Sequence, residues 1–182
     1  MARNLPSGVV VTGRPYGRFL ATNQTFDIWL VPLAGGGEPT PLLRTEFVEG
    51  NATFSPDGKW FAYVSDESGS FEVYVRPIDG SSGRLVVSRG AADDVIWSPR
   101  GDEILYRSDG RVFAVPIDLG GSGAAPRIGT PTALFPDRFL RTTGRDMDLS
   151  RDGRRLLMLA EVEPAKLVFF EHWFEALAAS SP

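Results

Sequence analysis

The sequence predicts an all-β fold built from repeated four-stranded sheets, and two recurring patterns indicate it. One is a turn that returns about every 40 to 50 residues, in the four copies Arg14-Pro15-Tyr16-Gly17, Ser55-Pro56-Asp57-Gly58, Ser98-Pro99-Arg100-Gly101 and Ser150-Arg151-Asp152-Gly153. The other is a strand end that carries proline, in Val31-Pro32-Leu33, Arg76-Pro77-Ile78 and Val115-Pro116-Ile117. Repeats of this length with four short strands each are the signature of a β-propeller, so we predict a propeller or part of one.

The composition suits this fold and excludes several classes of protein. With 182 residues, 20 glycines and 14 prolines, the chain has the size of one domain and is rich in turns. The absence of cysteine excludes disulfides, thiolate catalysis and cysteine metal sites. A net charge of −4 argues against a nucleic-acid binder. Because no membrane span or secretory-signal pattern is visible, we expect no membrane insertion and a cytoplasmic protein, unless the chain is a fragment of a membrane-anchored parent.

We treat residues 1–182 as a single propeller or half-propeller domain with four units, at 8–46, 47–90, 91–136 and 141–178. The strands expected in the first unit are Gly8–Thr12, 19–22, 27–33 and 41–45. Those of the second unit are Glu49–Phe54, 60–64, 71–78 and 85–88. The third unit is expected to contain 95–97, 103–107, 111–117 and 131–135. Short apolar runs bounded by turns, as in 60–64, are typical of strands buried on both faces, which is what stacked sheets require.

The fourth unit departs from this pattern. Its expected strands are 145–149, 156–160 and a third that starts at Lys166, with no fourth strand. Apolar residues then recur at helical spacing, at Phe170, Trp173, Phe174 and Leu177. This spacing predicts a short C-terminal amphipathic helix, which either packs on its own sheet or docks a partner.

Residues 17 to 178 resemble the TolB-like and WD-type propeller repeats at the C-terminal end of many bacterial serine/threonine protein kinases. The segments that carry the resemblance are Phe54-Ser55-Pro56-Asp57-Gly58-Lys59-Trp60, Tyr63-Val64-Ser65-Asp66-Glu67-Ser68-Gly69, Glu72-Val73-Tyr74-Val75-Arg76-Pro77 and Trp173-Phe174-Glu175-Ala176-Leu177. The resemblance implies a sensing or interaction platform. The glycine-rich phosphate loop, the His-Arg-Asp loop and the Asp-Phe-Gly metal site of a kinase domain are absent from this sequence, so we expect no phosphoryl transfer.

Ring closure has two solutions at this number of units. Four units can close as a four-bladed ring, which lies within the range of known propellers. Alternatively, a half-ring pairs with a second copy, because open sheet faces and edges at both ends invite association. We favour the homodimer.

Aromatic residues on the connecting loops are the candidates for a binding face. They are Tyr16, Phe26, Phe47 and Phe71. Each of them could equally fill the interface between two units. We predict that they contact a protein or small-molecule ligand.

Five acidic residues and one asparagine near the first strands of the second, third and fourth units are the candidates for a metal site, because the first strands of a propeller line its channel. The residues are Glu49, Asn51, Asp93, Asp94, Asp146 and Asp148. Oxygen ligands that converge on one axis suit a hard cation such as Ca²⁺, which can polarise a lactone or ester carbonyl and activate water. This arrangement would resemble the calcium-dependent propeller lactonases. The other interpretation is that these side chains solvate the channel mouth or cap turns.

The sequence thus favours a non-catalytic binding module that presents a rigid loop face to a protein or small ligand. The alternative is a calcium-dependent hydrolase of lactones or esters. Serine-based hydrolysis is not supported, because no Gly-x-Ser-x-Gly elbow is present and the only histidine, His172, lies in the aromatic tail.

Overall fold

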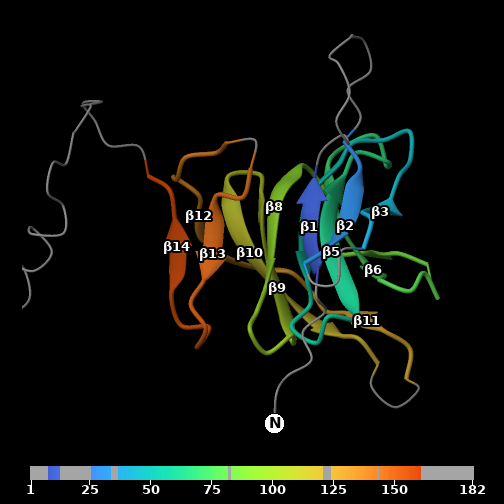
Figure 1. Ribbon diagram of the computed structural model, residues 1–182. Helices are drawn as coiled ribbons and strands as arrows, with labels where there is room; N and C mark the ends of the chain where they lie inside the picture. Colours follow the sequence, from blue (N-terminus) through green and yellow to red (C-terminus); the bar gives the residue numbers. More distant parts are fainter. Residues whose placement is uncertain are drawn as a thin grey trace, which may run out of the picture.

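The computed structural model describes residues 8–12, 26–33, 37–81, 83–120, 124–142 and 144–160. Over these residues all regular structure is strand, arranged in antiparallel sheets (Figure 1). The part of the chain described here contains no helix that is long and apolar enough to cross a membrane. Tyr16, His172, residues 19–22 and the predicted C-terminal strand and helix lie outside the described residues.

The second unit has the predicted four strands in their predicted order. They are β4 (Glu49–Phe54), β5 (Trp60–Ser65), β6 (Glu72–Pro77) and β7 (Leu85–Val86), and each is hydrogen-bonded to the next along the chain. The central strand β5 is buried on both faces over residues 61–65, as its unbroken apolar run predicted. This unit is therefore one complete propeller-type sheet.

The third unit repeats this arrangement with a divided outer strand. Its inner strands are β8 (Ala92–Trp97), β9 (Glu103–Ser108) and β10 (Arg111–Asp118). Two outer segments, β11 (Arg127–Ile128) and β12 (Thr132–Pro136), both pair with β10. The division lets the outer edge follow the full length of the long strand β10.

The first unit differs from its prediction. Its described strands are β1 (Gly8–Thr12), β2 (Ile28–Pro32) and β3 (Thr40–Leu43), and β1 pairs directly with β2. The registers are the same in the first three units: Gly8 lies opposite Pro32, Trp60 opposite Pro77, and Glu103 opposite Pro116.

Gly8–Thr12 is therefore the counterpart of the second strands β5 and β9, and the prediction that it is a first strand is wrong. An apolar run of three valines is equally suited to either place, so its composition did not distinguish them. The predicted turn Arg14-Pro15-Tyr16-Gly17 comes after Gly8–Thr12 in the sequence and lies outside the described residues.

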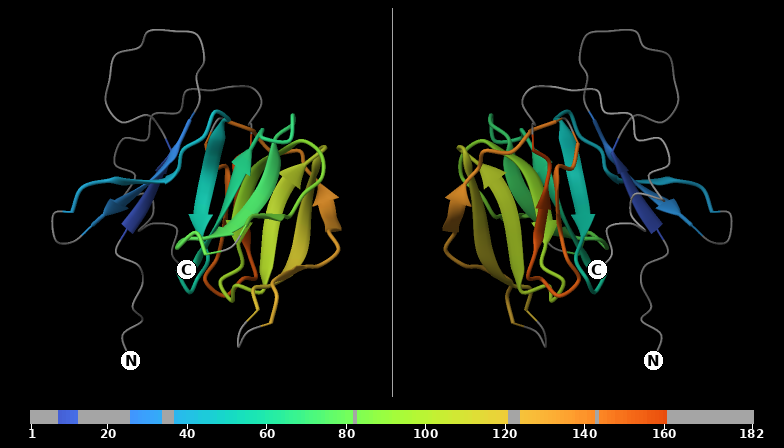
Figure 2. Two further views of the ribbon diagram at one scale, coloured as in Figure 1. Left: turned by 90° about the vertical axis from the view of Figure 1, so that its right-hand side faces the viewer. Right: turned by 90° about the vertical axis from the view of Figure 1, so that its left-hand side faces the viewer.

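The fourth unit contributes two described strands, β13 (Met147–Leu149) and β14 (Leu156–Met158). The first strands of successive units pack beside one another, β4 beside β8 and β8 beside β13. In Figure 1, β13 and β14 lie to the left of β8, and β1–β3 lie to its right. Figure 2 shows the second and third units standing side by side as twisted sheets. The first strands thus lie next to one another, as expected in a propeller.

Three of the four predicted turns are structurally equivalent. In each turn the backbone carbonyl of the serine accepts a hydrogen bond from the N–H of the glycine three residues later, at 2.8–2.9 Å. The serines are Ser55, Ser98 and Ser150. Those glycines have positive φ, of 69°, 78° and 69°. A Cβ added to Gly101 would lie 3.4 Å from Cδ of Pro56, and one added to Gly153 would lie 3.6 Å from Cδ of Pro99. The turns of the third and fourth units therefore each rest on the turn of the preceding unit.

The hydrophobic core lies between consecutive units. One cluster joins the first and second units, a larger one the second and third, and another the third and fourth. Stacked aromatic pairs occupy equivalent places, Tyr63 with Tyr74 at 5.5 Å and Tyr106 with Phe113 at 5.2 Å between ring centroids. Each of these pairs faces the preceding unit.

Candidate functional site

Two of the predicted binding aromatics occupy equivalent places at one end of the molecule. We call this end, where second strands turn into third strands, the hairpin end. The carbonyl of Phe26 accepts the N–H of Glu49 at 2.9 Å, and the carbonyl of Phe71 accepts the N–H of Ala92 at 2.8 Å. Because Glu49 and Ala92 each begin a first strand, each phenylalanine links its unit to the next. Their side chains are 46% and 44% exposed.

Two further aromatic residues lie at the hairpin end. Phe47 is half-buried, and its N–H donates to Oγ1 of Thr45 at 3.1 Å. Phe139, 37% exposed, was not among the predicted residues. The segment that carries it begins at Asp137, whose N–H donates to the carbonyl of Gly110 in the β9–β10 hairpin at 2.7 Å. The hairpin end therefore carries aromatic side chains from several units.

A fully buried arginine holds the segment that carries Phe139. Arg107 donates from Nε to Oδ2 of Asp137 at 2.8 Å and from Nη2 to Oδ1 at 3.0 Å. It also donates to the carbonyls of Phe139 at 3.1 Å and Leu140 at 3.0 Å, and its Nη1 lies 3.6 Å from Oδ2 of Asp146. Every contact goes to the segment that joins the third and fourth units.

Arg141 extends this network to Asp93 on the first strand β8. It donates to Oδ2 of Asp137 at 2.8 Å and to Oδ2 of Asp93 at 2.7 Å. Burial raises the pKa of Asp137, but hydrogen bonds from Arg107 and Arg141 outweigh it and leave that pKa below its usual range. Burial raises the pKa of Asp93, against the attraction of Arg141.

Equivalent residues of the first strands link one unit to the next. The side-chain amide of Asn51 donates to the carbonyl of Asp93, and the N–H of Asp146 donates to Oδ2 of Asp94 at 3.0 Å. Asp94 is 2% exposed. Its burial raises its pKa to about 6, although the N–H groups of Asp146 and Val95 stabilise the ionised form.

Four of the six predicted metal ligands are engaged in these contacts, namely Asn51, Asp93, Asp94 and Asp146. Asp93, Asp94 and Asp146 come together, but beside two guanidinium groups. Glu49, 1% exposed, accepts a hydrogen bond from Thr45 through Oε1 while its Oε2 has no partner, and burial raises its pKa. Asp148 is exposed. Among the residues with described placement, no group of three or more histidine, cysteine, aspartate or glutamate side chains is arranged to hold a metal ion.

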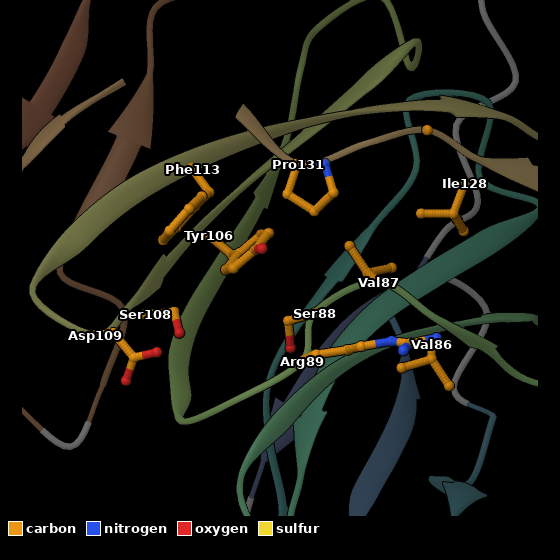
Figure 3. Close-up of a pocket in the computed structure, with 11 residues that line it drawn as sticks. Val86, Val87, Ser88, Arg89, Tyr106, Ser108, Asp109, Phe113, Ile128 and Pro131 are labelled. Carbon is orange, nitrogen blue, oxygen red and sulfur yellow. The ribbon is translucent and has the colours of Figure 1, made fainter. Parts of the chain in front are cut away.

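A pocket of about 380 Å³ opens between the second and third units (Figure 3). The stacked rings of Tyr106 and Phe113 form one wall, and Val87 and Ile128 lie across from them. Polar groups surround the rest, from Ser88, Arg89, Ser108 and Asp109. Asp109 has a positive φ of 45°, so the tight β9–β10 turn presents its carboxylate at the edge of the pocket.

The fold has a counterpart among solved structures. A crystal structure of TolB from Acinetobacter baumannii superposes with a TM-score of 0.60 at 16% identity, over 87% of this chain and 36% of that one. This chain has a TolB-like β-propeller fold. No protein-family model matches the sequence.

Two curated relatives are similar to this TolB-like propeller in sequence. The uncharacterized protein Atu1656 of Agrobacterium fabrum is 32% identical over 127 residues, which are 65% of this chain and 42% of that protein. Tricorn protease homolog 1 of Streptomyces coelicolor is 30% identical over 128 residues, 67% of this chain and 11% of that protein. The chain thus spans less than half the length of these relatives.

The residues that were missed in this TolB-like propeller are Phe139 and the charged residues Arg107, Asp137 and Arg141. A signal for Arg107 was present, because this residue interrupts an apolar strand at the place where the second unit has Val64. A charged residue inside a strand with two buried faces requires a buried partner. The partner could not be located, because Asp137 is thirty residues away in a segment without repeat pattern.

Proposed function

We propose that this TolB-like propeller is a non-catalytic binding module that presents its hairpin end to a protein or small ligand. The observation that carries the proposal is the equivalence of Phe26 and Phe71, two exposed phenylalanines anchored through their carbonyls to the next unit. Exposed aromatic side chains on a rigid backbone supply contact area at little cost in conformational entropy, which is why they dominate binding hot spots.

The support beneath this end is rigid. Arg107 binds the carbonyls of Phe139 and Leu140 directly, so the exposed Phe139 stands on a segment fixed by a buried guanidinium. Positions held in advance lose less entropy on binding than mobile loops do. The hairpin end is thus built to meet a partner without rearrangement.

The pocket beside Tyr106 extends the same surface. Its Ser108–Asp109 edge belongs to the β9–β10 hairpin, and its floor is aromatic. An apolar group from the ligand fits against Tyr106 and Phe113, with a polar group directed to Arg89 or Asp109. The preferred ligand is therefore a peptide segment or small molecule that carries an apolar group and a polar group close together.

A random peptide library displayed on phage tests the proposal. Peptides selected on the wild-type protein are expected to lose binding to Phe71→Ser and to Phe26→Ser. Leu134→Ser is the matched control, because Leu134 is 47% exposed on the outer strand β12, and it should retain binding. Equal binding to all three variants, or no enriched peptide at all, would contradict the proposal.

The calcium-dependent hydrolase stays a prediction. The arrangement of Asp93, Asp94 and Asp146 supports it less well, because Arg107 and Arg141 already supply positive charge at these carboxylates. A cation there would have to compete with two guanidinium groups. Turnover of a model lactone that depends on added Ca²⁺ and is lost with chelator would favour the hydrolase.

A further inference from the structure

The fourth unit has one face toward the third unit and one face away from it, which we call its far face. The far face exposes apolar residues at positions that are buried in the other units. Leu157 is 71% exposed, whereas its counterparts Ala62 and Leu105 are 0% and 6% exposed. The counterparts follow from the common register of the turns, in which Ser55, Ser98 and Ser150 each pair with the first residue of the second strand.

The same relation holds two residues further along. Leu159 is 47% exposed, and its counterparts Val64 and Arg107 are 5% and 0% exposed. Ala62 and Val64 belong to the cluster that joins the second unit to the third, and Leu105 to the cluster that joins the third to the fourth. In a complete array, these positions are therefore covered by the following unit.

The near face of the fourth unit is already covered. Met147, Leu156 and Met158 pack with Ile96 and Leu105 of the third unit. The side chains alternate along each strand, so the residues between them must point away from the third unit. Leu157 and Leu159 are those residues.

The first unit presents the complementary face at the other side of the molecule. Leu33 is 68% exposed, whereas its counterpart Ile117 is 5% exposed against the preceding unit. Trp29, the counterpart of Phe113, is half-buried at the same face. Figure 1 places these strands and β14 on opposite sides of β8, so the two faces do not cover each other.

We propose that the far face of the fourth unit, with Leu157 and Leu159, docks on the first unit of a second copy, at Leu33 and Trp29. The occupant is a copy of this chain because it supplies the type of face that follows each internal unit. The relation is reciprocal in two copies, so two equal interfaces close a ring with two-fold symmetry. Such a ring has twice the units of one chain and stays within the known size range of propellers.

Light scattering coupled to size-exclusion chromatography tests this proposal over a wide range of concentration. The wild-type protein is expected at twice the chain mass of 19.8 kDa. Leu157→Asp and Leu33→Asp, one on each face, should each shift the mass to that of the monomer, because a buried carboxylate without a partner opposes association.

Val86→Asp is the matched control. Val86 is 49% exposed on β7, which belongs to neither face, and this variant should remain dimeric. Circular dichroism of each variant verifies that it is folded. A wild-type monomer at every concentration would overturn the proposal, as would a dimer that survives both face variants.

Discussion

Arg107 and Asp137 form a two-point ion pair, with Nε to Oδ2 at 2.8 Å and Nη2 to Oδ1 at 3.0 Å, and neither side chain is exposed to solvent. The planar guanidinium matches the carboxylate, so both charges are satisfied where water does not reach them. The pair ties β9 to the segment that leads into the fourth unit. It thereby fixes the place of that unit in the array.

Removing one member of this pair should strongly destabilise the protein. Arg107→Gln leaves Asp137 and Asp146 without their common partner, and we expect a loss of about 3 to 5 kcal/mol in the free energy of unfolding. Urea denaturation measures it. Arg100→Gln is the control, because Arg100 pairs with Asp102 on the surface, where both side chains are largely exposed, and should change stability by less than about 1 kcal/mol. Similar losses in both variants would contradict this interpretation.

Alanine at the turn glycine of the third unit should also destabilise the fold. Gly101 has a φ of 78°, and its added Cβ would approach Cδ of Pro56 to 3.4 Å. We expect Gly101→Ala to lower the free energy of unfolding by about 1 to 2 kcal/mol. Alanine is strained at this positive φ, and its Cβ also comes into contact with Pro56. Gly83→Ala is the control, because a Cβ there meets nothing within 4 Å. A thermal melt that shows no difference between the two variants would refute this expectation.

The stability should depend on the ionisation of Asp94. Because burial raises its pKa from 3.8 to about 6 in the folded state, the folded protein binds this proton more tightly than the unfolded chain does. The stabilising effect of the proton is complete below pH 3.8 and is lost as the pH rises through 6. Relative to wild type, Asp94→Asn should gain about 1 to 3 kcal/mol between pH 4 and pH 7.

Urea denaturation of both proteins across this pH range measures the effect of Asp94→Asn. The exchange is conservative in size, because asparagine keeps a side-chain oxygen that can accept the N–H of Asp146. Asp118→Asn, at an exposed aspartate, serves as control and should follow wild type at each pH. If the free energies of unfolding of Asp94→Asn and wild type change with pH in parallel, Asp94 does not titrate in this range.

Calcium should leave the stability unchanged. The carboxylates of Asp93 and Asp146 already face Arg141 and Arg107, so they have little charge left to attract a cation. We expect the same melting temperature with Ca²⁺ and with a chelator. A clear rise in melting temperature with Ca²⁺ would instead support the metal-dependent alternative, since a ligand that binds only the folded state stabilises it.

The repeated turns made most of the fold predictable. Ser55, Ser98 and Ser150 stand at the same distance before a glycine with positive φ, and local sequence determines such a turn. The proline at the end of each third strand gave a second marker. Around Gly8–Thr12 the turn marker was misleading, because Arg14-Pro15-Tyr16-Gly17 was interpreted as the turn that follows a first strand.

The candidate site was predictable only in part. The exposed positions of Phe26 and Phe71 were predictable because both residues stand on loops next to strands with clear patterns. The roles of Asp93, Asp94 and Asp146 depend on Arg107 and Arg141, which approach from other segments of the chain. Side-chain partners so far apart in sequence follow from tertiary packing, which periodicity does not encode.

The contact of each turn glycine with the proline of the preceding turn has an evolutionary consequence. Gly101 lies next to Pro56 and Gly153 next to Pro99, so the turn Ser98-Pro99-Arg100-Gly101 supplies the glycine of one contact and the proline of the next. A gene segment that encodes one such motif can be duplicated in tandem, and the new module brings a matching surface for each neighbour. Chains of this kind can therefore lengthen by whole modules that reuse the same glycine–proline contact between turns.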